Sequence, residues 1–106
     1  MTGLEITPRE LSDMRERGDV FQLVDVRAPW EHDLASIPGD VLIPLQNLAE
    51  KAGQLDASIP VVVYCHQGAR SYAAARALRE AGYDATSLRG GIDLWSLQID
   101  PTVGRY

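Results

Sequence analysis

VVVYCHQGARS, residues 61–71, is the segment from which the architecture of this chain can be worked out. Its β-branched and aromatic start predicts a strand over Val61–Tyr64. An alanine-rich segment then predicts a helix from Ser71 to Ala81, and Gly82 is placed to end it. The sequence therefore predicts a strand, a short loop that begins at Cys65, and a helix.

Similar signals predict further elements on both sides of this unit. Thr7 can accept a hydrogen bond from the third helical amide and Glu10 can reach back to the cap, which is a typical helix start. The remaining expected elements are a helix that runs to about Arg17, strands at 20–26 and 85–88, a short apolar run at 41–45 after a tight turn, a helix over 45–54, and a short helix after Gly90-Gly91. Strands and helices that alternate in this way indicate an α/β class with a mostly parallel sheet, and we expect one domain over residues 1–106.

Composition limits the partners that the chain can have. Its 106 residues carry a formal net charge of -5, and Lys51 is the only lysine, which argues against nucleic-acid binding. No apolar run approaches the roughly 20 residues that span a bilayer, and the first ten residues lack a basic region followed by an apolar run. We therefore expect a cytoplasmic protein that binds neither nucleic acid nor membrane. One cysteine cannot form an internal disulfide, and with His32 and His66 alone a zinc site lacks ligands, so we expect no metal.

Cys65 lies where α/β sheets usually bind ligands, beyond the carboxyl end of a strand. The loop amides from His66 to Ser71, the positive end of the following helix and the Arg70 guanidinium all favour an anion there. These surroundings predict a reactive thiolate without a general base, so a Cys/His dyad is the weaker explanation. The alternative is a thiol that only packs in the core, which is the commoner role of a single intracellular cysteine. Gly68 in the loop and Arg70 at its end favour the reactive interpretation.

CHQGARS resembles the active-site loop of the rhodanese family, in which the cysteine comes first and a basic residue is common near the end. Other blocks are similar to the family's patterns in the expected order: Asp25-Val26-Arg27, Trp30-Glu31, Ile37-Pro38-Gly39 and Ile43-Pro44-Leu45, then Gly90-Gly91 with Trp95. The resemblance covers nearly the whole chain. Two departures are Ala35-Ser36, where the family often has histidine or Gly-His, and Asp40, where alanine is frequent.

The resemblance implies a rhodanese-like fold, with five mostly parallel strands flanked by helices on both faces, and a double-displacement sulfur transfer. Cys65 would take sulfur from a small donor such as thiosulfate, hold it as a persulfide without another cofactor, and pass it to a small acceptor such as cyanide or a thiol. Arg70 would attract the donor's sulfonate. The persulfide's charge would be held by the amides of the loop residues His66, Gln67, Gly68, Ala69 and Ser71.

The tail from Gly90 to Tyr106 resembles the end of rhodanese modules joined to adenylating enzymes. A ubiquitin-like sulfur-carrier protein, or its adenylating enzyme, is therefore an implied partner.

Two other function classes stay open. Cysteine phosphatases and arsenate reductases also close a loop from cysteine to arginine, but their loops resemble Cys-x5-Arg, whereas four residues separate Cys65 from Arg70. Rhodanese-like modules that only bind or regulate typically lack the cysteine, which this chain keeps. Catalysis of sulfur transfer is the stronger hypothesis.

Several side chains outside the loop have less certain roles. Arg27 either lines the mouth of the site, as its matching family position sometimes does, or pairs with a surface carboxylate. Glu31, His32 and Asp33 suggest a metal corner, but consecutive side chains diverge, so we expect them on a solvated surface. Gly90-Gly91 lacks the lysine-serine continuation of a phosphate loop and predicts a backbone turn.

Overall fold

The computed structural model describes residues 3–106 and contains a five-stranded sheet. The strands are β1 (Glu5–Ile6), β2 (Gln22–Asp25), β3 (Val41–Leu42), β4 (Val61–Tyr64) and β5 (Ala85–Leu88). Their order across the sheet is β1-β5-β4-β2-β3, and every neighbouring pair is parallel. All carboxyl ends therefore lie at one edge of the sheet, and the central strand β4 brings Cys65 to that edge.

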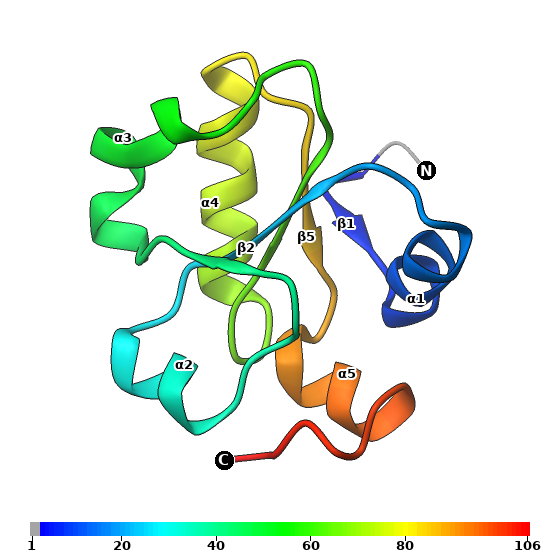
Figure 1. Ribbon diagram of the computed structural model, residues 1–106. Helices are drawn as coiled ribbons and strands as arrows, with labels where there is room; N and C mark the ends of the chain where they lie inside the picture. The colour runs from blue at the N-terminus through cyan, green and yellow to red at the C-terminus, as the bar shows by residue number, and fades with distance from the viewer. Residues whose placement is uncertain (1–2) are drawn as a thin grey trace.

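Helices cover both faces of the sheet (Figure 1). On one side lie α1 (Pro8–Arg17) and α5 (Gly91–Gln98), and on the other lie α3 (Leu48–Lys51) and α4 (Ala69–Glu80). The short helix α2 (Pro29–Leu34) follows β2. This arrangement confirms the predicted α/β class with helices on both faces.

The pleat of β4 divides the core into two layers. Val61, Val63 and Cys65 belong to the apolar cluster that contains Ala74 of α4, whereas Val62 and Tyr64 belong to the cluster on the other face. Successive side chains of a strand point to opposite faces, so a central parallel strand is buried on both sides. Cys65 continues this alternation and therefore points toward the α4 side.

The structure shortens several predicted elements. Val20 is exposed and β2 begins only at Gln22, while β3 ends at Leu42. The predicted helix over 45–54 is divided into α3 and two flanking 3-10 turns, Leu45–Asn47 and Ala52–Gln54. An apolar run shows where side chains are buried, but the length of the pairing strand decides where a ladder stops.

The starts of helices α1 and α4 and the strand β1 can be compared with the predictions. The capping box of α1 is confirmed, because Thr7 accepts from the Glu10 amide at 3.1 Å and the Glu10 carboxylate accepts from the Thr7 amide at 2.9 Å. Helix α4 begins at Ala69, two residues before the predicted start at Ser71. Strand β1 was not predicted, since two residues are too few to show a period. It adds to the sheet edge by pairing with β5.

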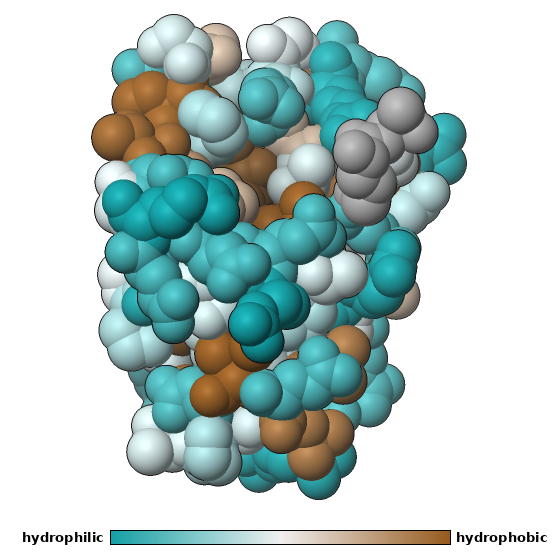
Figure 2. Space-filling view, turned by 90° about the vertical axis from the view of Figure 1, so that its right-hand side faces the viewer, coloured by the Kyte–Doolittle hydropathy of each residue, from teal (hydrophilic) through white to brown (hydrophobic). Residues whose placement is uncertain are grey.

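The surface beside α1 is mostly hydrophilic, and its apolar side chains form small separate patches (Figure 2). Among residues 3–106, every helix is too short or too polar to cross a bilayer.

Candidate active site

The sulfur of Cys65 is buried and surrounded by hydrogen-bond donors. The Gly68 amide donates to Sγ at 3.1 Å and the Ser71 amide donates at 3.4 Å, while the Ser71 hydroxyl lies 3.3 Å away. Cys65 itself is 1% exposed. Amides at the start of a helix carry the positive end of its dipole, so this pocket suits a sulfur anion.

The local chain conformation explains why these amides point at the sulfur. Gly68 caps α4 in the left-handed region, at φ 116°, and only the four residues 65–68 separate the strand from the helix. Because α4 starts at Ala69, the amide of Ser71 is still free of a helical partner. The Ser71 hydroxyl lies 2.7 Å from that of buried Ser87 on β5, which continues the polar contacts behind the sulfur.

Helix α5 holds the loop from the other side. The Ile92 amide donates to the Cys65 carbonyl at 2.9 Å, and the Asp93 amide donates to the His66 carbonyl at 3.1 Å. Gly91 has a φ of +59°, and a Cβ built on it would overlap both of these carbonyl oxygens. The predicted turn at Gly90-Gly91 is confirmed, and its second glycine lets α5 approach the cysteine loop.

Arg70 lies against Glu31 of α2. Its two terminal nitrogens donate to the two carboxylate oxygens at 2.6 and 2.9 Å, and the Glu31 side chain is 6% exposed. These hydrogen bonds lower the pKa of Glu31 to about 2 and raise the pKa of Arg70, to which the charge of nearby Cys65 also contributes. The expectation that Glu31 lies on a solvated surface is wrong, because Arg70 and the short helix bury it.

Tyr106 closes this corner and was not predicted as part of the site. Its ring stacks on His66 with centroids 4.1 Å apart, and its hydroxyl donates to Glu31 at 2.6 Å. Burial, followed by the hydrogen bond to Glu31, raises its pKa to about 12. The side chain is distant from the loop in sequence, so local pattern carries no signal for this contact. Glu31 had a weak signal, because it lies two residues after Pro29 at a helix start.

Arg27 occupies neither of the two predicted positions. It is fully buried, and it donates to both carboxylate oxygens of buried Asp25, at 2.9 and 2.8 Å. A further bond of 2.8 Å reaches the Tyr106 hydroxyl. Burial alone would lower the pKa of Arg27, but the hydrogen bonds with Asp25 and Tyr106 outweigh it and raise that pKa. Arg27 therefore supports the site from behind.

One cluster has the composition of a metal site. Single ligand atoms of Asp25, His32 and Asp40 lie within 4.8 Å of one another. However, Asp25 already accepts from Arg27 and lies 2.9 Å from the His32 ring, and Asp40 accepts from Tyr64. A cation there would have to compete with a guanidinium, so the contacts favour an internal ion cluster. His32 thus contacts a buried carboxylate and does not lie on a solvated surface as predicted.

The six predicted loop residues have unequal roles. Gly68 and Ser71 contact the sulfur, while the ring of His66 is turned toward Tyr106. Gln67 and Ala69 are exposed, and neither hydrogen-bonds Sγ among the contacts of residues 3–106. The structure therefore brings two of the predicted amides to the sulfur.

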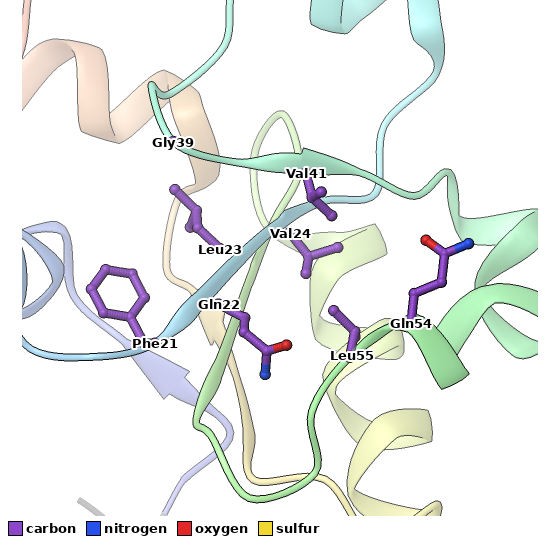
Figure 3. A pocket seen from close by; sticks show the side chains of 8 residues that line it. All are labelled: Phe21, Gln22, Leu23, Val24, Gly39, Val41, Gln54 and Leu55. Atoms are coloured by element: carbon purple, nitrogen blue, oxygen red, sulfur yellow. The ribbon is translucent and has the colours of Figure 1, made fainter.

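A cavity of about 320 Å³ lies elsewhere, beside the edge strand β3 (Figure 3). Its lining comes from β2, β3 and the segment before β4: Phe21, Gln22, Leu23, Val24, Gly39, Val41, Gln54 and Leu55. This lining includes no titratable side chain and no residue of the cysteine loop. It therefore takes no part in the chemistry at Cys65.

A family model and sequence relatives both match this chain. A family model described as "Rhodanese-like domain" matches residues 7–98. The chain is 42% identical over 107 residues to the probable adenylyltransferase/sulfurtransferase MoeZ of Mycobacterium tuberculosis, which covers 98% of this chain and 27% of that protein. It therefore spans about a quarter of the length of this relative.

A second relative has a size closer to that of the chain. The thiosulfate sulfurtransferase GlpE of Pseudomonas syringae is 36% identical over 91 residues, covering 85% of this chain and 84% of that protein. Among solved structures, the rhodanese-like domain protein of Staphylococcus aureus superposes with a TM-score of 0.86 at 26% identity, covering 98% of this chain and 99% of the other.

Proposed function

The chain belongs to the rhodanese-like domain family, and from that premise we propose that it is a sulfurtransferase that carries a sulfane sulfur as a persulfide on Cys65. The observation that carries the proposal is the set of polar groups around Sγ: the donating amides of Gly68 and Ser71, and the Ser71 hydroxyl 3.3 Å away. Preorganised donors at the start of a helix stabilise both a thiolate and the persulfide anion that replaces it.

The first half-reaction loads the cysteine. The Cys65 thiolate attacks the outer sulfur of a donor such as thiosulfate, a new S–S bond forms, and the old S–S bond breaks. Sulfite leaves with the bonding electron pair, and the enzyme holds Cys65-S-S⁻. The loop amides stabilise this charge, so the step needs no metal and no separate cofactor.

The second half-reaction removes the outer sulfur from the Cys65 persulfide. A nucleophilic acceptor attacks the outer sulfur, and the Cys65 thiolate leaves. Cyanide would leave as thiocyanate, and a thiol would leave as a persulfide. Since the resting cysteine must stay reduced and unpaired, we propose a reducing compartment such as the cytoplasm.

The similarity to MoeZ supports a protein as the sulfur acceptor. The relative MoeZ is named as both an adenylyltransferase and a sulfurtransferase. We propose that the acceptor of this chain is a ubiquitin-like sulfur-carrier protein, activated by its adenylating enzyme. Its activated terminus would approach the cysteine loop beside the stacked rings of His66 and Tyr106.

Intact-mass spectrometry tests the persulfide. Purified protein is treated briefly with thiosulfate and then with cyanide, beside the matched Cys65→Ser variant. We expect the mass of one added sulfur atom, lost on cyanide treatment as thiocyanate appears, and no adduct on the variant. If thiosulfate, mercaptopyruvate and organic persulfides all leave the mass unchanged, the catalytic proposal is wrong and a binding module remains. Hydrolysis of an aryl phosphate by such a protein would point instead to a cysteine phosphatase.

A further inference from the structure

The loop's cation is already engaged by a carboxylate. Arg70 makes a two-pronged contact with Glu31, whose oxygens lie 2.6 and 2.9 Å from its terminal nitrogens. The Arg70 side chain is 40% exposed, but the Glu31 side chain is 6% exposed and comes from another helix. The pair has no net charge, although one of its members faces the solvent beside Cys65.

Glu31 is held firmly in this position. Oε1 also accepts from the Ala28 amide at 3.2 Å, and Oε2 also accepts from the Tyr106 hydroxyl at 2.6 Å. That hydroxyl in turn accepts from Arg27 at 2.8 Å. With two donors on each oxygen, the carboxylate cannot follow Arg70 if the guanidinium swings toward a ligand. Such a movement would leave a buried carboxylate with one strong partner fewer.

Two further arginines, Arg27 and Arg105, are also paired with carboxylates. Arg27 pairs with Asp25 at 2.8 Å, and Arg105 pairs at 2.8 Å with Asp93, whose amide binds the cysteine loop. The chain as a whole carries a net charge of -5. Both the local and the overall charge therefore work against a dianion that approaches the sulfur.

We propose that Glu31 determines the donor specificity of this site: by neutralising Arg70 it makes Cys65 take sulfur from organic persulfides in preference to dianionic donors. This inference rests on the proposed sulfurtransferase function and narrows its substrate class. In the step, the Cys65 thiolate attacks the outer sulfur of R–S–SH and forms a new S–S bond. The S–S bond of the donor breaks, the thiolate RS⁻ leaves with the electron pair, and the proton remains on the transferred sulfur.

Three donors of graded charge test the proposal: thiosulfate, the persulfide of 2-mercaptoethanol and the persulfide of cysteamine. The initial rate of sulfur loading on Cys65, followed by intact mass against donor concentration, gives a KM and a maximal rate for each. The quantity compared is the KM for thiosulfate divided by the KM for cysteamine persulfide. A residue that acts only on stability would not move these two constants in opposite directions.

Glu31→Gln frees the charge of Arg70 while keeping the shape of the side chain. We expect the KM ratio to fall about tenfold, which corresponds to about 1.4 kcal/mol, with the change in KM rather than in the maximal rate. Tyr106→Phe removes one donor from Glu31 but leaves the charge of the carboxylate on Arg70, so the ratio should stay within about twofold of the wild type. Should Glu31→Gln fail to fold, Arg70→Gln carries the test, because it leaves the charge of Glu31 without its partner and the ratio should then rise.

Two controls separate the mechanism from a general charge effect. Asp19→Asn changes the net charge equally and releases Arg17 from a remote exposed pair, so the ratio should stay as in the wild type. Glu31→Gln combined with Arg70→Gln restores a neutral pair and should return the ratio to the wild-type value. A ratio unchanged by Glu31→Gln, or shifted equally in the double variant, overturns the inference. If no donor loads the wild type at all, the proposed function itself fails.

Discussion

Replacing Gly91 with alanine should weaken the fold and slow sulfur loading together. Gly91 lies in the left-handed region at φ +59°, where a side chain costs about 1–2 kcal/mol. Its Cβ would also overlap the carbonyl oxygens of Cys65 and His66, so the loop or the start of α5 must move. That movement breaks the bonds from the Ile92 and Asp93 amides, each worth about 1 kcal/mol net. We expect a loss of about 3–4 kcal/mol in the free energy of unfolding.

Gly18→Ala is the matched control for this change. Gly18 also has a positive φ, 72°, but nothing lies within 4 Å of the position of a new Cβ. It should therefore lose only the conformational part, about 1–2 kcal/mol. Urea denaturation followed by circular dichroism gives both values. The difference between the two variants isolates the close approach of α5 to the cysteine loop.

Sulfur loading provides the second measurement. Because the displaced carbonyls belong to the loop that positions the Gly68 amide, Gly91→Ala should slow persulfide formation at Cys65, whereas Gly18→Ala should not. Equal losses of stability in the two variants, with equal loading rates, would refute the view that Gly91 is required for the contact between α5 and the loop.

Three further outcomes follow from the contacts. Asp25→Asn leaves the buried charge of Arg27 unpaired and should cost about 3–5 kcal/mol in urea denaturation; a loss below 1 kcal/mol would contradict this. Since the guanidinium partner of Glu31 lowers its pKa from 4.5 to about 2, the ionised carboxylate stabilises the fold above about pH 4.5 and ceases to do so as the pH falls to 2. The difference in Tm between wild type and Glu31→Gln should accordingly shrink across that window, and a constant difference would exclude the linkage. Ser71→Ala removes the hydroxyl 3.3 Å from the Cys65 sulfur and should slow loading about tenfold at unchanged KM, measured by intact mass.

Local pattern predicted those parts of the fold that are determined within a few residues. The capping box at Thr7 and Glu10 and the strand Val61–Tyr64 were correct, because a cap depends on neighbouring residues and a central strand is apolar throughout. Element ends were less accurate. The predicted helix over 45–54 is divided into the short helix α3 and two 3-10 turns, because element ends depend on tertiary packing that local sequence does not record.

Within the site, the sequence indicated the backbone better than the side chains. The position of Cys65 beyond a central strand, and of Gly68 and Ser71 around it, follows from chain connectivity alone. The surroundings of Glu31 and Arg27 were misjudged, because charged side chains are usually solvated and their burial depends on partners that lie far away in sequence.

The sequence by itself determined the α/β class, the family resemblance and the placing of one cysteine at the start of a helix, all of which depend on the order and spacing of neighbouring residues. Only the tertiary structure decided what surrounds that cysteine. Glu31 from α2 binds Arg70, and Tyr106 from the far end of the chain binds Glu31, because the parallel strands bring their loops to one edge of the sheet. The interaction between charges depends on their distance in space, so the positions of Glu31 and Arg70 along the chain do not show that they neutralise each other.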